Sequence, residues 1–410
     1  MLRPLLVRKV SLTLALTFVA FLFSFPGCSR ERDGRVTKKA PSKAKNIILM
    51  VTDGMGLADV TAARIFKNGP DGQRLHLETL THIGFQRTHS ADNSVTDSAA
   101  AASAWANGEK FRNGEISCHD DDQDGKCEPA PRPTILEIAK DKGKSTGLVV
   151  TSTVTHATPA AFGAHVFTRG CENEIARQYI QVTGVDVILG GGLKKFNSKE
   201  NKADECSTYG NFIAEAETRG YQVVYTKEAM DSAAARGSEK ILGLFAPKGK
   251  TPELFRVYPE EHYPPDEPTL PQMTAAALKI LEKDRNGFFL LVEGSQIDWA
   301  NHRNSLPYQV SEILGFDEAV KVVLDWINHE PKRKQNTLVI ITPDHETGGF
   351  AINAGDEGPY APGDLVKDAW TTGGHTATDV PVWSQGPGSR YLGRSHDNTD
   401  LYKVMKEVLR

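Results

Sequence analysis

The sequence lacks an excess of positive charge and any internal repeat. In 410 residues, 48 lysines and arginines face 52 aspartates and glutamates, so the net charge is −4. Nucleic acid is therefore not expected as a specific partner. An anionic substrate would need a local positive site, such as metal ions. The length is enough for one large α/β domain or two ordinary ones.

The sequence also has no apolar run of ordinary membrane-spanning length at its N-terminus. The run from Val10 to Phe25 has 16 residues, follows basic residues and ends in Pro26-Gly27-Cys28. This pattern predicts an export signal rather than a retained anchor. Gly27-Cys28 resembles a bacterial lipoprotein cleavage box, although Phe25 and Pro26 depart from the preferred residues. We expect localisation to the periplasmic side of the bacterial cell envelope, with a signal peptide over 1–28, lipidation at Cys28, a flexible tether over 29–44 and a catalytic domain over 45–410.

Cysteine is scarce, with five residues in the chain. Apart from Cys28, the four that remain allow three pairings. In an oxidising compartment, the simplest pairing joins Cys118 to Cys127 and Cys171 to Cys206. Free buried thiols are the alternative, which export disfavours.

Short apolar runs alternate with helical patterns along the chain. The uninterrupted run 46–52 is typical of a strand buried on both faces of a parallel sheet. Further strands are expected at 146–150, 185–189, 221–225, 241–245, 288–292, 338–341 and 380–383, and helices at 135–142, 175–181, 212–219, 273–283, 309–328 and 401–409. This alternation predicts an α/β fold: a single domain whose doubly wound, mostly parallel central sheet has helices on both faces. Segments 246–272 and 351–370 read as surface insertions.

A serine lies at the start of one predicted helix. Thr96 and Asp97 are helix-start residues, alanines dominate the next positions, and Asn107-Gly108 ends the run. The free N–H groups of such a helix start would stabilise an anion beside Ser98. On this stretch alone, a simple helix cap is the more economical interpretation.

Carboxylates and a histidine follow three of the predicted strands. Asp53 comes after the first strand, Glu293 after 288–292, and Asp344-His345 after 338–341. Each alone is a commonplace turn residue. Because the carboxyl ends of parallel strands share one edge of a sheet, together they predict a site there.

Other positions extend this set. Asp298 and His302 are four residues apart, so on a helical turn they face the same way and can share an ion; a surface pair is the alternative. His375 is isolated in sequence. Mixed histidine and aspartate ligands suit zinc, whereas an all-oxygen site suits magnesium. His156 follows another strand, and Arg169 could clamp a phosphate group or form an ordinary salt bridge.

These residues lie in stretches that resemble the bacterial alkaline phosphatases, in unbroken order from about Asn46 to the C-terminus. The stretches are VTDGMG at 51–56, TDSAA at 96–100, HATPA at 156–160, VEG at 292–294 with Asp298 and His302, TPDHETGG at 342–349, and GHT at 374–376. Each is weak alone, and all six in order are specific.

The resemblance implies two zinc ions and a third ion, usually magnesium. The implied ligands are Asp298, His302 and His375 for one zinc; Asp344, His345 and Ser98 for the other, with Asp53 bridging to the third ion; and Thr158 and Glu293 for the third ion. The resemblance also implies Ser98 as a nucleophile that forms a phosphoserine, and Arg169 as a phosphate clamp. It implies Asp97 as the residue that orients Arg169.

Two positions depart from part of the family. His156 stands where some members carry an aspartate near the third metal, and Trp299 where some carry a lysine near the phosphate; other bacterial members share this pair. An imidazole in place of a carboxylate weakens a site for magnesium and favours zinc or cobalt instead.

A separate acidic loop at 118–128 has the spacing D-x-D-x-D-G at Asp120, Asp122 and Asp124. Alternating carboxylates before a glycine can present oxygens to calcium. Position twelve of the pattern is Pro131 rather than Glu, so the loop is no complete EF-hand. An acidic surface loop closed by a disulfide is the alternative.

We therefore expect an exported, metal-dependent enzyme that releases inorganic phosphate from small-molecule phosphate monoesters. The alternatives are a phosphodiesterase of the same superfamily and a non-catalytic phosphate-binding lipoprotein, which would leave the zinc ligands unexplained. The only contact expected with a membrane is through the N-terminal lipid. Many family members are homodimers, but no stretch of this sequence identifies an interface.

Overall fold

The computed structural model describes residues 42–122, 124–128, 130–197, 205–257, 264–355 and 358–410. The predicted signal, Cys28 and most of the tether lie outside these residues. A ten-stranded sheet has the order β14-β2-β13-β8-β1-β7-β3-β4-β6-β5. Its strands are β1 (Asn46–Thr52), β2 (His82–Arg87), β3 (Ser145–Thr153), β4 (Val187–Gly191), β5 (Gln222–Val224), β6 (Ile241–Leu244), β7 (Phe288–Gly294), β8 (Thr337–Thr342), β13 (Val380–Gln385) and β14 (Ser395–Asp397).

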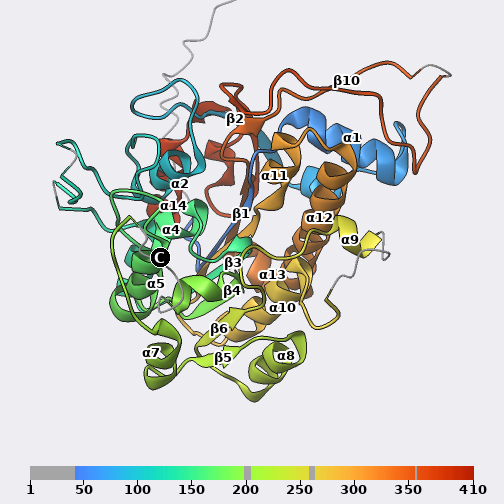
Figure 1. Cartoon of the computed structure of the whole chain (residues 1–410). Coiled ribbons are helices and arrows are strands. Elements are labelled where there is room, and N and C mark those ends of the chain that lie inside the picture. The colour runs from blue at the N-terminus through green and yellow to red at the C-terminus, as the bar shows by residue number, and fades with distance from the viewer. Residues whose placement is uncertain (1–41, 123, 129, 198–204, 258–263, 356–357) are drawn as a thin grey trace, which may run out of the picture. The chain divides into compact units, whose positions relative to one another are not determined.

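Helices cover both faces of the sheet (Figure 1). Successive side chains of a strand point to opposite faces. Accordingly, Ile47, Leu49 and Val51 of β1 pack into one core, and Ile48 and Met50 into the other. The first core includes α2 (Ser98–Asn107), α3 (Ile135–Asp141), α4 (Ala157–Gly163), α5 (Glu172–Gln178) and α14 (Thr399–Val408); the second includes α1 (Leu57–Asn68), α8 (Lys227–Arg236), α10 (Leu270–Leu281) and α12 (Leu306–His329).

The predicted mostly parallel α/β sheet is confirmed, with one antiparallel region. β13 runs antiparallel to both β2 and β8. β2 was not expected from the sequence, because Ile83 and Phe85 point outward and are exposed while polar Gln86 is buried. Its burial pattern is thus the reverse of the one that apolar periodicity predicts.

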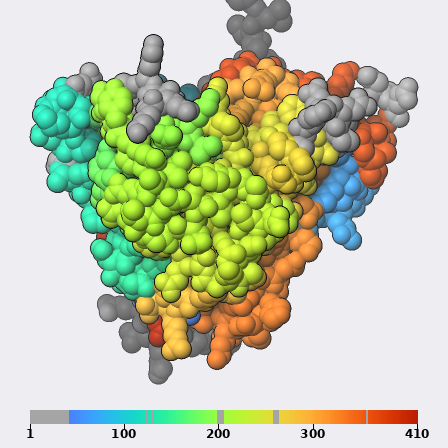
Figure 2. Space-filling model, turned by 60° about the horizontal axis from the view of Figure 1, so that its bottom comes forward, coloured from blue at the N-terminus to red at the C-terminus, as the bar shows by residue number. Residues whose placement is uncertain are grey.

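Smaller elements complete the described chain. They are α6 (Leu193–Phe196), α7 (Phe212–Thr218), α9 (Leu254–Val257), α11 (Gln296–His302), α13 (Pro331–Asn336), a π-helix (Tyr179–Thr183), two 3-10 helices (His76–Thr79 and Ser389–Tyr391) and the short strands β9 (Glu346–Thr347), β10 (Ala351–Ile352), β11 (Asp368–Ala369) and β12 (His375–Thr376). Figure 2 shows α7, β5 and α8, coloured yellow-green, spread over one face of the domain. Among the described residues, no helix combines the length and apolarity required to cross a bilayer.

Two disulfides join the four described cysteines, Cys118 to Cys127 and Cys171 to Cys206. These are the two pairs that the sequence favoured. The segment 246–272 contains α9 and a buried ion pair between Lys250 and Glu267, 2.8 Å apart. The segment 351–370 contains the β10–β11 pair.

Strand order determines where the site lies. β8, β1, β7 and β3 are consecutive parallel neighbours, and Val51 of β1 is in register with Glu293 of β7. The residues that follow these strands therefore meet at one edge of the sheet.

Candidate metal centre and active site

Three buried carboxylates gather at the carboxyl edge of the sheet. Asp53, Glu293 and Asp344 are each 0% exposed. Both oxygens of Asp53, both of Glu293 and Oδ2 of Asp344 have no hydrogen-bond partner among the described residues. Burial, reinforced by neighbouring carboxylates, raises the pKa of Asp53 well above its ordinary value, and burial raises the pKa of Glu293 to about 8. Divalent cations would satisfy these oxygens and offset the cost of burying them.

Asp344 and His345 form a tight pair after β8. Asp344 Oδ1 accepts the backbone N–H groups of Gly54 and His345, each at 3.0 Å. His345 Nε2 lies 3.2 Å from Asp344 Oδ2 and 3.7 Å from Asp53 Oδ1. Although burial acts in the opposite direction, the charge of the His345 ring and the backbone N–H of Gly54 hold the pKa of Asp344 well below its ordinary value. The pair therefore offers a carboxylate oxygen and an imidazole nitrogen beside Asp53.

A second cluster of donors involves α11. Asp298 Oδ2 lies 3.2 Å from His302 Nε2, and Asp298 Oδ1 lies 3.6 Å from His375 Nε2. The Nε2 atoms of His302 and His375 are 3.2 Å apart. The other ring nitrogen of His302 contacts the Gly373 carbonyl at 2.7 Å, and that of His375 contacts the Thr96 carbonyl at 2.9 Å. These carbonyls orient both imidazoles with Nε2 toward Asp298.

Ser98 begins α2 beside the Asp344–His345 pair. Its Oγ lies 3.3 Å from His345 Nε2, and the residue is 3% exposed. Asp97 is the N-cap, and its Oδ1 accepts the N–H of Ala100 at 2.9 Å. Asp97 Oδ2 lies 3.0 Å from Arg169 Nη1. The serine hydroxyl, the helix start and a guanidinium are thus brought together.

Residues of the β3–α4 connection complete the site. His156 is the N-cap of α4, and its Nε2 lies 3.2 Å from Arg169 Nη2. Burial, and then the charge of Arg169, lower the pKa of His156 to about 4, which leaves a neutral ring that can ligate a metal. Thr158 Oγ1 is buried and has no partner in the part of the chain that the structure describes. Trp299 meets the His156 ring edge-on, with 6.2 Å between the ring centroids.

The donor atoms fall into groups of the size that one metal ion needs. Three groups share one edge of the sheet, and the ligand atoms within each lie within 4.8 Å of one another: Asp298, His345 and His375; Asp53, Asp344 and His345; Asp53, His156 and Glu293. Carboxylate oxygens with imidazole nitrogens fit zinc in the first two groups. A fourth group, Asp120, Asp122 and Asp124, belongs to the disulfide-closed acidic loop. The predicted zinc ligands, together with His156 and Glu293, lie in these groups or beside them, with His302 next to Asp298 and Ser98 next to His345, and the acidic loop is separate.

Sequence reasoning missed the hydroxyl of Thr347. It donates to Asp298 Oδ1 at 2.6 Å and lies 3.2 Å from His345 Nδ1. Thr347 therefore connects the two histidine-containing clusters. The signal was present in the sequence, because residues i and i+2 of an extended segment point the same way, as His345 and Thr347 do.

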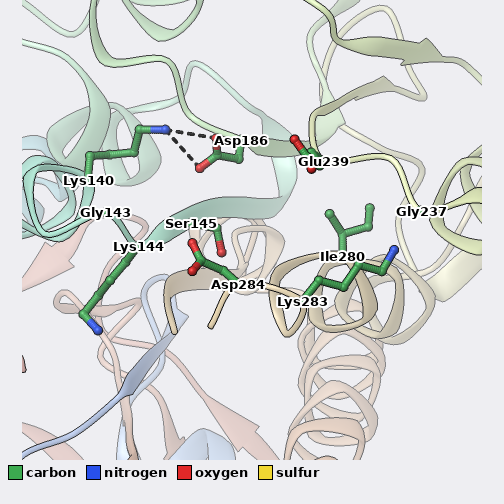
Figure 3. Close-up of a pocket in the computed structure, with 10 residues that line it drawn as sticks. All are labelled: Lys140, Gly143, Lys144, Ser145, Asp186, Gly237, Glu239, Ile280, Lys283 and Asp284. Carbon is green, nitrogen blue, oxygen red and sulfur yellow. Dashed lines mark hydrogen bonds and ion pairs between the residues drawn. The ribbon is translucent and has the colours of Figure 1, made fainter. Parts of the chain in front are cut away.

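A cavity of about 460 Å³ lies at the opposite edge of the sheet (Figure 3). Its lining includes Ser145, the first residue of β3, and Asp186, which directly precedes β4. Lys140 and Asp186 form an ion pair on one side of it, 3.0 Å apart. The metal-binding groups lie at the other ends of these strands, so the cavity is not part of the candidate site.

Comparison with known proteins agrees with this geometry. Residues 44–364 match the family described as alkaline phosphatase. The chain belongs to the alkaline phosphatase family. It is similar to alkaline phosphatase 3 of Bacillus subtilis (strain 168), with 33% identity over 98% of this chain and 97% of the relative. As an alkaline phosphatase, it is a phosphoric monoester hydrolase with candidate metal sites.

Solved alkaline phosphatases have the same fold. The enzyme from the Antarctic bacterium TAB5 is 33% identical, with a TM-score of 0.75 over 90% of this chain and 98% of that one. A mutant of that enzyme, with a histidine replaced by aspartate, is described with Mg bound in its M3 site; it is 33% identical, with a TM-score of 0.74 over 90% and 99% of the two chains. This alkaline phosphatase therefore shares its architecture along almost the whole length of those enzymes.

Proposed function

We propose that this phosphatase hydrolyses phosphate monoesters through a phosphoserine at Ser98. The observation that supports the proposal is the placement of Ser98 Oγ, 3.3 Å from His345 Nε2 and at the start of a helix whose cap also holds Arg169. A serine hydroxyl is a weak nucleophile unless it is activated by its surroundings. The residues around Ser98 supply metal ligands on one side and a phosphate-binding cation on the other.

Each residue has a distinct part in the proposal. Asp298, His302 and His375 would hold one zinc ion, and Asp53, Asp344 and His345 the other, with Ser98 as a further ligand. These ions, when bound, favour the serine alkoxide and neutralise charge on the phosphoryl group. Arg169 grips non-bridging phosphate oxygens through two N–H groups, and Asp97 keeps its guanidinium in place.

We propose that the third ion is held by Asp53, Thr158, Glu293 and His156. The partnerless buried oxygens of Asp53, Glu293 and Thr158 fit a hard cation such as magnesium. Neutral His156 adds a nitrogen, which favours zinc or cobalt. Magnesium in the M3 site of a histidine-to-aspartate mutant of the Antarctic enzyme supports a link between the residue at such a site and the ion bound.

The cellular setting of the proposal rests on the N-terminal sequence and the disulfides. Export to the bacterial cell envelope suits two disulfides, which persist in oxidising compartments. Lipidation at Cys28 and a homodimer belong to the same proposal. Small-molecule phosphate monoesters are the proposed substrates.

One set of assays separates the proposal from its alternatives. The protein should hydrolyse p-nitrophenyl phosphate much faster than bis-p-nitrophenyl phosphate, which a phosphodiesterase would prefer. Ser98→Ala should lose activity by a factor of about 10³ or more while still binding inorganic phosphate. Near-full activity in Ser98→Ala would exclude the covalent route. Phosphate binding without hydrolysis by the wild type would favour a phosphate-binding lipoprotein. Activity that survives thorough chelation would exclude the role of metals.

A further inference from the structure

One carboxylate outside the metal groups connects several parts of the active site. Glu172, the first residue of α5, accepts two hydrogen bonds on the same oxygen. Thr153 Oγ1 lies 2.8 Å and Thr155 Oγ1 2.7 Å from Glu172 Oε2. Its other oxygen, Oε1, pairs with Lys195 Nζ at 2.8 Å. Three elements, the end of β3, α5 and α6, therefore meet at this side chain.

These contacts fix the turn that carries His156. Thr155 is fully buried and directly precedes His156, and Thr153 is the last residue of β3. The two hydroxyls flank Val154, so a single carboxylate holds the turn at both of its ends. The side chain of Glu172 is 20% exposed, so water competes only weakly for these hydrogen bonds.

The same carboxylate is linked to the phosphate clamp. Arg169 precedes Glu172 by three residues, and its Nη2 lies 3.2 Å from His156 Nε2. Two hydrogen bonds therefore join the same two segments, one between Thr155 and Glu172 and one between His156 and Arg169. The Cys171–Cys206 disulfide anchors the chain immediately before α5. Such a closed arrangement limits the movement of one segment relative to the other.

We infer that Glu172 is a positioning residue, which sets the place of His156 for the third ion and of Arg169 for phosphate. This inference rests on the proposed function. Residues that orient metal ligands typically change metal affinity by about 10- to 100-fold when they are removed. Lys195 has a lesser part, because it stabilises the charge of Glu172 without contacting the turn.

The test measures ion and phosphate binding directly. Magnesium and zinc are titrated calorimetrically into the chelated, full-length protein, cation content per chain is measured by elemental analysis, and the inhibition constant of inorganic phosphate is determined. Glu172→Ala should weaken binding of the third cation by about 10- to 100-fold and phosphate by a smaller factor. Glu172→Gln, which keeps an acceptor for the threonine hydroxyls, should recover most of the affinity for the third cation and for phosphate. Thr155→Val should also weaken binding of the third cation. Added to Glu172→Ala, it should weaken this binding no further.

Glu174→Ala is the matched control. Glu174 lies on the same helix and pairs with Arg177, so its loss removes an acidic side chain and an ion pair from α5 without touching the turn. If Glu172→Ala binds the third cation and phosphate as Glu174→Ala does, Glu172 has no positioning role. A wild-type protein that binds only two cations would instead overturn the proposed third-ion site, so the two failures are distinguishable.

Discussion

Asp97 Oδ2 lies 3.0 Å from Arg169 Nη1, while Oδ1 of the same carboxylate caps the helix that begins at Ser98. Orientation of the arginine and the stability of the helix start therefore depend on one side chain. A substitution at Asp97 can separate the two effects, because asparagine keeps an oxygen for the cap but has no charge for the arginine.

Asp97→Ala and Asp97→Asn should both bind inorganic phosphate more weakly, by about three- to tenfold, because Arg169 loses its charged partner. Only Asp97→Ala should also lose about 1 kcal/mol of unfolding free energy, through the missing cap. Phosphate inhibition and urea unfolding measure the two quantities. Equal phosphate affinity in both variants and the wild type would contradict the role of Asp97.

The loop at Gly249 lies against the indole of Trp299. A Cβ at position 249 would be only 2.5 Å from Trp299 Cη2, so Gly249→Ala should displace the ring next to Asp298. We expect a changed tryptophan fluorescence spectrum, a several-fold change in the inhibition constant of phosphate, and a loss of about 1–3 kcal/mol of stability. Trp299→Phe, whose smaller ring leaves room, should relieve the strain in the double variant. Additive effects would mean that the two residues do not interact.

Glu312 of α12 should make stability depend on pH. It is buried, and its Oε1 accepts the N–H of Glu253 at 2.7 Å. Burial, and then the charge of Glu253, raise the pKa of Glu312 to about 8. The folded protein therefore holds this proton to higher pH than the unfolded chain, and the contribution of Glu312 to stability falls as pH rises from about 4.5 through 8.

Glu312→Gln removes the ionisable group, and with it the loss of stability that ionising Glu312 in the folded protein causes at high pH. Relative to the wild type, the variant should gain on the order of 2–4 kcal/mol of stability between pH 5 and pH 9. Chemical unfolding of both proteins at several pH values measures the difference. Glu318→Gln is the control, because Glu318 is on the same helix with its side chain half exposed. A constant difference between Glu312→Gln and the wild type across this pH range would contradict the prediction.

Calcium binding by the acidic loop stays a prediction. The ligand oxygens of Asp120, Asp122 and Asp124 lie within 4.8 Å of one another, and Cys118–Cys127 closes the loop. Calcium at ten times its dissociation constant would stabilise the protein by about 1.4 kcal/mol. A rise in melting temperature with calcium, absent in Asp122→Ala, would support the site. No rise in the wild type, with its catalytic ions kept saturated, would exclude it.

The sequence predicted the centre of the sheet better than its margin. β1 was expected over 46–52 and is found there, because a strand buried on both faces is apolar throughout. Helix starts were less well predicted. α10 begins at Leu270 rather than Met273, and α12 at Leu306 rather than Gln309. Both have a proline in the first turn, a position that proline tolerates because no N–H is needed there.

The residue types at the site could be read from the sequence, but their contacts could not. Asp53, Glu293 and His345 were expected at one edge of the sheet because each follows a predicted strand, and the family resemblance assigned them to metal ions. Chain order does not reveal which strands are neighbours. The Thr155–Glu172 hydrogen bond depends on the packing of α5 beside the end of β3. Such contacts involve side chains that are commonplace in sequence and become informative only in three dimensions.

The strand order also has a consequence for how the protein acquires its ions. Neighbouring strands β1, β7 and β8 begin at residues 46, 288 and 337, and His375 follows all of them in the chain. A growing polypeptide that already contains Asp53 must be extended by more than 300 residues before His375, the last histidine of the candidate site, exists. The group of Asp298, His345 and His375 can form only after His375 has been added and distant segments have paired, so ion loading of this group follows formation of the sheet. A bound ion there is thus a signature of molecules whose sheet has formed.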